Sequence, residues 1–212
     1  PKQAEFKFIK KIKEPGSPAM DRGKDMHKLC EEYIRGRFDE LPKELREFEE
    51  AFVKLKELHE LGQVTCESDW AITKDWDQTG WFDNDTWGRA KVDAFVYDEG
   101  NSKEARVIDF KTGRYEGNQE AHKEQCELYG GIALKRYPEL EKIITEMWYL
   151  DHGKIDRYIY TQESINIKRD KIPVRAVEMT EATEFPANPS KWKCKWCYFG
   201  KQNMCREKYE EY

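Results

Sequence analysis

The sequence predicts an α/β fold with a central mixed β-sheet flanked by helices. Two observations support this class: some segments repeat apolar residues at three- and four-residue steps, as helices do, and others are short, rich in β-branched and aromatic residues, and bounded by polar turns, as strands are. They occur in the order helix, helix, three strands, helix, two strands, which is typical of a mixed sheet covered by helices. A chain of 212 residues with 38% apolar content is long enough to bury a core.

Two helices are expected before the first strand. The Pro-Gly-Ser-Pro stretch at 15–18 predicts a loop, and a helix follows over 21–38 with His27 in its first turns. A second, amphipathic helix is predicted over 42–61, and Gly62 provides its stop. Its apolar face consists of Leu45, Phe48, Phe52, Leu55 and Leu58.

Three strands are expected next, over 64–73, 87–97 and 105–112. A polar, Trp-bearing loop separates the first two, and an acidic turn separates the second from the third. Consecutive strands joined in this way predict an antiparallel meander.

The last elements are a helix and a hairpin. The helix is predicted over 119–137, where Pro138 ends it. Strands over 143–150 and 155–161 flank a short turn and form the hairpin. The region after residue 161 has the weakest pattern, and we expect one short helix around 174–183.

Composition narrows the class of protein. Seven Trp and periodic apolar runs indicate a folded chain despite 37% charged residues. No stretch approaches the roughly 18 apolar residues of a membrane span, and the N-terminus lacks the apolar core of a signal peptide. We therefore expect an intracellular, cytoplasmic protein without a membrane partner.

Charge argues in two directions. A net charge of −5 argues against a protein that coats nucleic acid nonspecifically. Two local basic patches nevertheless occur, one in the N-terminal arm and one near the C-terminus, and solvated charge at flexible ends would explain either of them equally well. Their members are Lys7, Lys10, Lys11 and Lys13, and Lys191, Lys193, Lys195 and Lys201.

Three charged residues occur inside the second and third predicted strands. Asp109 and Lys111 are two apart and share a face, and Asp93 can face the same cleft from the preceding strand. Burying an unpaired charge is costly, so such residues indicate an ion pair or a functional site. Carboxylate oxygens are preferred ligands of Mg²⁺, and a bound Mg²⁺ ion can polarise a phosphoryl oxygen and activate a water molecule for phosphodiester hydrolysis. On the D-x-K spacing alone, an ordinary ion pair is the favoured interpretation.

The wider pattern resembles a known family. GRAKVDAFV, then VIDFKTG, then QCELYG look like the successive core motifs of RecB-like nucleases in the PD-(D/E)XK superfamily, and GKDMHKLCEE resembles the helix that bears their metal-binding histidine. The resemblance covers roughly residues 20 to 150. It implies a nuclease that cleaves DNA with Mg²⁺ or Mn²⁺. Stand-alone members are often phage-encoded, which suggests an exonuclease of replication, recombination or DNA breakdown, working in the host cytoplasm.

The resemblance also implies the principal site residues. Asp93 and Asp109 match the metal-binding carboxylates, Lys111 matches the catalytic lysine, and His27 matches the histidine that reaches the metal from the helical side.

Three further positions are implied with lesser roles. Gln125 and Tyr129 lie four apart on one helix face and match the Q-x-x-x-Y motif, which contacts substrate or orders catalytic groups. Glu67 resembles an acidic position ahead of the catalytic hairpin that supports the ligands or holds a second metal. Arg89 is a separate candidate from its place just before the strand of Asp93, and an exposed surface arginine is favoured there over a contact with phosphate.

The C-terminal cysteines form a separate motif. Cys194, Cys197 and Cys205 have the C-x₂-C-x₇-C spacing of zinc or iron–sulfur sites. In the family, such a trio joins a cysteine that lies ahead of the histidine helix to hold a [4Fe–4S] cluster. This sequence has no cysteine before His27, so the fourth ligand is unassigned. Three alternatives are open: the fourth cysteine lies ahead of Pro1, a different residue type supplies the ligand, or the site is empty or degenerate. The missing cysteine favours the last of these.

We therefore expect residues 1–190 to form a nuclease domain with a basic N-terminal arm, and residues 191–212 to form a cysteine-containing segment packed on it. The remaining cysteines, at 30, 66 and 126, are expected to be small buried residues. A non-catalytic nucleic-acid-binding or protein-interaction module with the same fold is the alternative, although the intact polar set argues against it. An RNA-directed nuclease would use the same catalytic residues.

Overall fold

The computed structural model describes residues 2–169, 177 and 181–209. The chain divides into two compact units, Pro18–Pro173 on the one hand and Pro1–Ser17 with Val174–Tyr212 on the other. The expected boundary at residue 190 differs from this division, because the N-terminal arm groups with the C-terminal segment. Packing of residues 191–212 on the nuclease domain stays a prediction.

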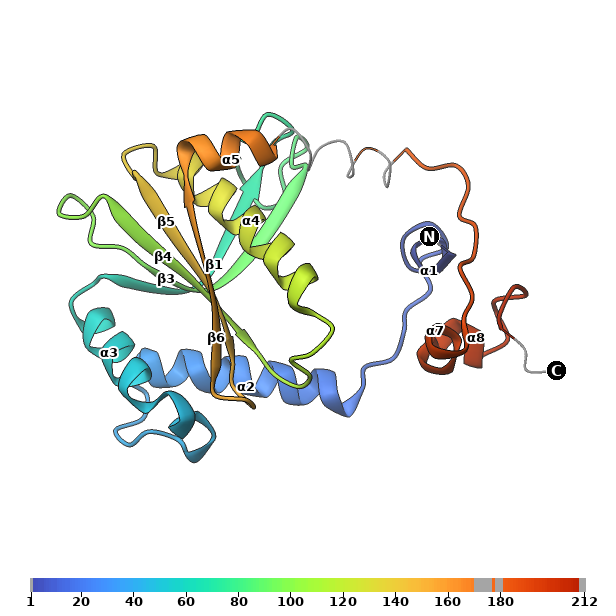
Figure 1. The fold of residues 1–212 in the computed structure, drawn as a ribbon, viewed down its shortest axis with the longest axis horizontal. Helices are drawn as coiled ribbons and strands as arrows, with labels where there is room; N and C mark the ends of the chain where they lie inside the picture. The colour runs from blue at the N-terminus through green and yellow to red at the C-terminus, as the bar shows by residue number, and fades with distance from the viewer. Residues whose placement is uncertain (1, 170–176, 178–180, 210–212) are drawn as a thin grey trace. The chain divides into compact units, whose positions relative to one another are not determined.

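A mixed sheet forms the centre of the larger unit, as predicted, and it has six strands where five were expected (Figure 1). The spatial order is β2-β1-β3-β4-β5-β6. The strands are β1 Val64–Ile72, β2 Gln78–Thr79, β3 Gly88–Val96, β4 Glu104–Lys111, β5 Lys142–Tyr149 and β6 Lys154–Thr161. Strands β1, β3 and β4 form the predicted antiparallel meander, and β5 and β6 form the predicted hairpin. The parallel pairing of β4 with β5 makes the sheet mixed. Strand β2 lies in the stretch predicted as loop.

Helices flank the sheet, most of them close to where the sequence placed them. They are α2 Pro18–Ile34, the 3₁₀ helix η2 Lys43–Phe48, α3 Glu49–Glu60, α4 Gln119–Arg136 and α5 Gln162–Arg169. Helix α2 begins earlier than predicted, at Pro18, and it also ends earlier, because Gly36 has a φ of 72° and follows the helix as a left-handed stop. The helix predicted over 42–61 is a 3₁₀ helix followed by an α-helix, and α5 was not predicted.

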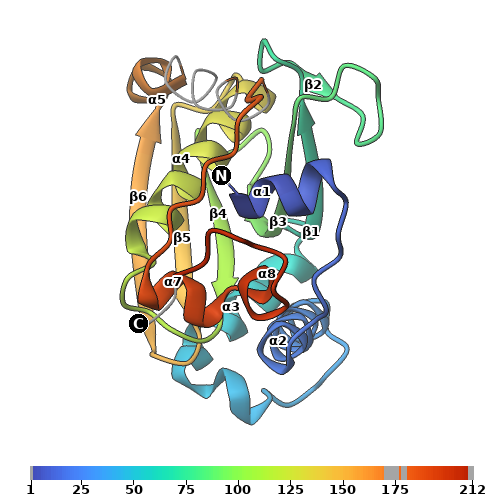
Figure 2. The same ribbon diagram turned by 90° about the vertical axis from the view of Figure 1, so that its right-hand side faces the viewer.

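The smaller unit contains short helices, with α1 in blue and α7 and α8 in red in Figure 2. They are α1 Lys2–Ala4, the π-helical turn η1 Glu5–Ile9, α7 Lys191–Trp196 and α8 Tyr198–Lys201. Most of the helix predicted around 174–183 lies outside the described residues. No helix in the described part of the chain is long and apolar enough to span a bilayer.

The sheet of the larger unit separates two hydrophobic clusters. One includes Ile132 of α4 with Val107 of β4, and the other includes Phe52 of α3 with Phe110 of β4. Neighbouring residues of a regular strand point to opposite faces. Asp109 and Lys111 therefore lie on the α4 side of the sheet, as the two-residue spacing predicts.

Candidate active site

The ladder between β1 and β3 lacks one pair in its middle. The two strands keep the same register on both sides of the gap, which leaves Glu67 and Asp93 opposite each other and unpaired in the ladder. Glu67 has a φ of 56°, in the left-handed region that costs a non-glycine residue about 1–3 kcal/mol. Strands β3 and β4 pair only over residues 94–96 of β3 and 106–108 of β4. The sheet is thus open around Asp93.

At this gap both strands change the face to which their side chains point. Cys66 and Ala94 belong to the cluster with α2 and α3, whereas Trp70 and Val92 belong to the cluster with α4. Strict alternation would have placed all four residues on one face. The switch was not predicted.

Asp93 joins α2 to the end of β4. Its Oδ1 lies 3.0 Å from Nδ1 of His27, and its Oδ2 accepts a hydrogen bond of 2.7 Å from the backbone N–H of Phe110. The carboxylate therefore satisfies an amide at the open end of the ladder. Burial acts to lower the pKa of His27, but the hydrogen bond and the charges of Asp93 and Asp109 together raise it.

Asp109 is held from the other face by α4. Its Oδ1 accepts hydrogen bonds from Nε2 of Gln125 at 3.0 Å and from the hydroxyl of Tyr129 at 2.9 Å, and its Oδ2 lies 2.6 Å from Nζ of Lys111. Lys111 also donates to Oε1 of Gln125 at 3.0 Å. Burial and the charge of Asp93 raise the pKa of Asp109, while Lys111 opposes that shift. The sequence-predicted pair is formed, and Gln125 bridges both members.

Three groups converge as candidate metal ligands. His27, Glu67 and Asp93 each offer an atom, and these atoms lie within 4.8 Å of one another, a grouping of three or more found nowhere else among the residues that the structure describes. The predicted set was His27, Asp93 and Asp109, with Glu67 in a lesser role. The cluster contains Glu67 and not Asp109, and Oε2 of Glu67 also lies 2.7 Å from Nζ of Lys91.

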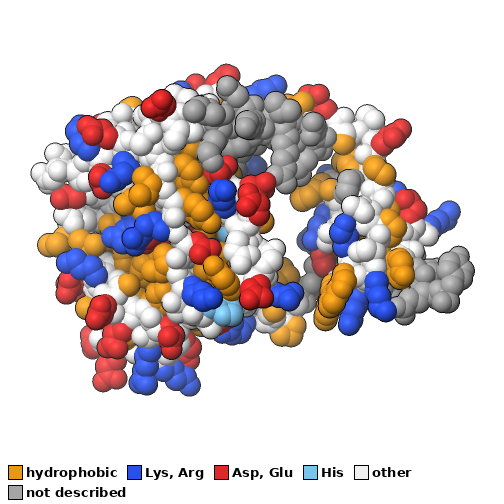
Figure 3. All heavy atoms as spheres, in the orientation of Figure 1, with side chains coloured by type: hydrophobic (Ala, Val, Ile, Leu, Met, Phe, Trp, Pro, Cys, Tyr) orange, Lys and Arg blue, Asp and Glu red, His pale blue; other side chains and the backbone are white. Residues whose placement is uncertain are grey.

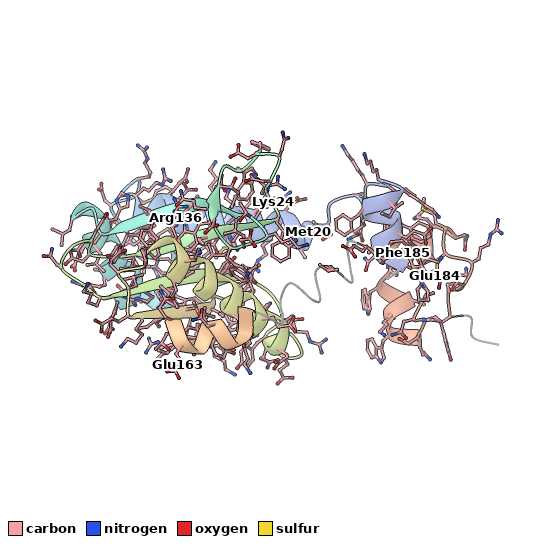
Figure 4. The ribbon with its side chains drawn as sticks, turned by 90° about the horizontal axis from the view of Figure 1, so that it is seen from above. Met20, Lys24, Arg136, Glu163, Glu184 and Phe185 are labelled. Atoms are coloured by element: carbon pink, nitrogen blue, oxygen red, sulfur yellow. The ribbon has the colours of Figure 1, made fainter. Side chains whose placement is uncertain are left out.

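These groups line an open cleft of about 850 Å³. Its walls come from α2, β1, β3, β4 and α4, and Met20 and Lys24 are labelled on the α2 side in Figure 4. Basic side chains around the carboxylates are Lys24, Lys28, Arg89 and Lys91. The arrangement combines hard oxygen ligands, an ammonium group and surrounding cations, which suits a polyanionic substrate.

The model of the family described as the PD-(D/E)XK nuclease superfamily matches residues 2–206. This chain belongs to the PD-(D/E)XK nuclease superfamily. Among 22 matching chains of solved structures, SSO0001 has a TM-score of 0.39 and 17% identity, and the match covers 89% of this chain and 100% of that chain. A protein from Eubacterium rectale, provisionally named an exonuclease, has a TM-score of 0.48 and 13% identity, with 97% and 81% covered. No curated protein matches significantly.

In this PD-(D/E)XK chain the structure brings together every residue of the predicted cleft. His27, Asp93, Asp109 and Lys111 all line it, and Arg89 does too, although its Nε is hydrogen-bonded to the carbonyl oxygen of Trp81 at 2.6 Å. Superfamily members use divalent metal ions, and the nitrogen and carboxylate donors present fit Mg²⁺ or Mn²⁺. The roles of the individual residues stay proposals.

The cysteines of this nuclease behave in two ways. Those at positions 30, 66 and 126 are buried, as expected, and burial raises the pKa of Cys66 and that of Cys126 to about 11 each. The thiols of Cys194, Cys197 and Cys205 do not form a metal-ligand group within the described part of the chain. The zinc or iron–sulfur site that the cysteine spacing suggested therefore has no structural support.

A polar clamp connects α2 of the nuclease to the turn after β4. The guanidinium of Arg22 donates two hydrogen bonds to Asp151, of 2.9 and 2.5 Å, and Oδ2 of Asp151 accepts from the backbone N–H of Gly113 at 2.6 Å. Arg22 holds the pKa of the Asp151 carboxyl below its ordinary value. The clamp thus ties the helix that carries His27 to the strand that ends at Lys111.

This clamp predicts a pH-dependent contribution to stability. Because the folded-state pKa of Asp151 is lowered, its contribution is present above about pH 4 and is lost as the pH falls through the folded-state value. We expect Asp151→Asn to lower the free energy of unfolding by about 1 kcal/mol at pH 7, and we expect this difference to shrink as the pH falls below about 4. Urea unfolding at pH 7 and at a series of lower pH values measures this. Asp21→Asn, at an exposed carboxylate on α2, is the control; an undiminished difference at low pH contradicts the prediction.

Tyr129 gives a second test within the site. Its hydroxyl lies 2.9 Å from both Asp109 Oδ1 and the carbonyl oxygen of Lys91, and it accepts from Gln125 at 2.6 Å. We expect Tyr129→Phe to lower the free energy of unfolding by about 1–3 kcal/mol, because a buried carboxylate loses a donor. Urea unfolding measures it, with Tyr137→Phe, whose half-buried ring stacks on Phe95, as the control. Equal losses in the two variants would show that the contact with Asp109 is unimportant.

Proposed function

We propose that this protein is a Mg²⁺- or Mn²⁺-dependent deoxyribonuclease of the RecB-like, phage type, and that it acts as a cytoplasmic exonuclease in DNA replication, recombination or degradation. One observation supports the proposal above others. The ligand cluster of His27, Glu67 and Asp93 lies in the same cleft as the Asp109–Lys111 pair. A metal centre and a cationic group in one open cleft are what phosphodiester hydrolysis requires.

The donor set fits the proposed ion. His27, Asp93 and Asp109 would hold it, and Glu67 would join them, since the side chains at 27, 67 and 93 already converge. The strained backbone of Glu67 favours this role, because strain of this kind clusters at functional sites. When bound, a divalent ion polarises the phosphoryl oxygen and lowers the pKa of a water molecule.

The chain's own residues would do the rest of the work. Lys111 would orient the attacking water and stabilise negative charge that develops on the phosphate. Gln125 donates to Asp109 and accepts from Lys111, so it fixes the carboxylate and the ammonium group relative to each other. Lys24, Lys28 and Arg89, on the cleft wall, would bind the flanking phosphates of the strand.

The function is tested by incubating the protein with end-labelled linear DNA, covalently closed circular DNA and labelled RNA, each with Mg²⁺, Mn²⁺ or EDTA. We expect linear DNA to be degraded to short products with either ion, and neither circular DNA nor RNA to be cleaved. Cleavage of the circle would replace the exonuclease assignment by an endonuclease, and cleavage of RNA alone would overturn the DNA assignment. Binding of DNA without cleavage under every condition would favour the non-catalytic module.

The ligand assignment can be tested without cleavage. We expect Glu67→Gln to weaken Mn²⁺ binding at least about tenfold in calorimetric titration, because the amide removes one negative charge from the cluster. Glu31→Gln is the matched control, since Glu31 also lines the cleft but lies outside the ligand cluster. Equal affinities of Glu67→Gln and the wild type for Mn²⁺ would remove Glu67 from the ligand set.

A further inference from the structure

The smaller unit carries an aromatic and basic surface that the nuclease site does not explain. We call it the α7 platform and define it as Trp192, Lys195, Trp196 and Lys201. Trp192 is 70% exposed and Trp196 is 67% exposed. The two rings are four residues apart on one short helix, so they lie on one side of it. Large aromatic rings this exposed, and adjacent to each other, are candidates for a binding surface.

Lysines lie directly beside these rings. Nζ of Lys195 is 5.7 Å from the ring centre of Trp192 and 5.4 Å from that of Trp196, and Nζ of Lys201 is 5.5 Å from Trp196. Basic and hydrophobic side chains accordingly lie next to one another over α7 and α8 in Figure 3. Neither Lys195 nor Lys201 has an ion-pair partner among the residues with described positions. Their charge is therefore available to a ligand.

The local charge is opposite in sign to that of the whole protein. Residues 190–205 contain four Lys and no Asp or Glu, within a chain whose net charge is −5. A surface this basic on an acidic protein favours a polyanionic ligand. The sequence alone shows these lysines, but it does not distinguish a binding surface from solvated charge at a flexible end.

The platform is supported by a small packed core. Phe199 of α8 is fully buried, and the ring of Phe6 stacks on it with centroids 4.9 Å apart and planes at 21°. Ser190 caps α7 by accepting a hydrogen bond of 3.2 Å from the backbone N–H of Lys193. The exposed rings are thus presented on an ordered base, which lowers the entropy lost when a ligand binds.

We propose that the α7 platform binds single-stranded DNA, with bases stacked on Trp192 and Trp196 and phosphates paired with Lys195 and Lys201. Proteins that bind single strands combine aromatic rings with lysines in this way, because every base has a stackable face and every linkage has a charge. Bases within a duplex are already stacked on one another, so a duplex would use the lysines alone. The proposal deepens the proposed function, since it assigns the nuclease a second contact with its substrate.

The test measures binding of the full chain to a fluorescent oligothymidylate of about 20 nucleotides, by anisotropy in EDTA. We expect Trp192→Ala and Trp196→Ala each to weaken binding about tenfold, because a stacked base contributes about 1–3 kcal/mol. Trp196→Phe should retain most of the affinity, since it keeps an aromatic ring. Lys195→Gln should reduce the slope of log K against log salt by about one. Phe8→Ala, in the same unit and 71% exposed, is the control and should bind as the wild type does.

Several outcomes would overturn the platform. They are unchanged affinity in the Trp192→Ala/Trp196→Ala double variant, tighter binding of a duplex of equal length, tighter binding of oligouridylate, and binding of anionic lipid vesicles without binding of the oligonucleotide. Circular dichroism of each variant confirms that it folds. EDTA prevents metal-dependent cleavage, so the binding assay is independent of the cleavage assay. A protein that binds through the two tryptophans but cleaves nothing with Mg²⁺ or Mn²⁺ would support this inference and contradict the proposed function. Cleavage with tryptophan-independent binding would do the reverse.

Discussion

Replacing Asp109 by asparagine is expected to reduce metal-dependent cleavage of linear DNA by about a thousandfold or more. The amide has nearly the shape of the carboxylate, so Tyr129 can still donate to its oxygen. It carries no negative charge, however, and can neither neutralise a bound ion nor attract Nζ of Lys111, which lies 2.6 Å from the carboxylate. Single-turnover rates on end-labelled DNA in Mn²⁺ measure the loss.

The same variant separates function from folding. Burial and the charge of Asp93 raise the pKa of Asp109. The ionised carboxylate of a group whose folded-state pKa is raised opposes folding at neutral pH. We therefore expect Asp109→Asn to unfold at no lower temperature than the wild type. Asp69→Asn, at an exposed aspartate of β1, is the control for the rate. A fully active Asp109→Asn protein would remove Asp109 from the reaction.

Replacing Lys111 by methionine is expected to reduce cleavage about a hundred- to a thousandfold while Mn²⁺ affinity is retained or increased. Methionine keeps much of the side-chain length, but it offers no charge to the phosphate and no donor to Oε1 of Gln125. Removing a cation close to the carboxylates also removes its repulsion of the ion. Parallel measurements of the cleavage rate and of Mn²⁺ binding test both parts of this prediction.

The control for Lys111→Met is Lys54→Met, at an exposed lysine of α3. If Lys111→Met loses Mn²⁺ binding as well as cleavage, the role of Lys111 is to support Asp109 rather than to take part in the reaction. Full activity of Lys111→Met would contradict the proposed role outright.

The α4 side of the site could be predicted because its elements are regular. Strand β4 alternates without interruption, so a two-residue spacing was sufficient to place Asp109 and Lys111 on one face. Helix α4 is likewise continuous, and a four-residue spacing placed Gln125 and Tyr129 on one side. Where backbone geometry is uniform, sequence spacing determines direction.

The Glu67 side could not be predicted in the same way. The apolar residues Val64, Cys66, Trp70 and Ile72 fall at even positions and suggest a single buried face, but the structure distributes them over two. Nothing in the sequence marks the change, because left-handed backbone is usually signalled by glycine or asparagine and here falls on a glutamate.

The contact between Phe6 and Phe199 could not be predicted either. It joins residues near the two ends of the chain, and local sequence patterns carry no information about such distant pairs.

The interrupted ladder beside Asp93 has a mechanical consequence. Backbone hydrogen bonds between neighbouring strands make a sheet stiff, and β1, β3 and β4 have no residues paired with one another at the level of Glu67 and Asp93. The backbone is therefore less constrained at this level than in the paired parts of the sheet. Glu67 and Asp93 can therefore adjust toward an ion without breaking a backbone pair between β1 and β3, while the paired residues of these two strands on either side of the gap keep that wall of the cleft in place.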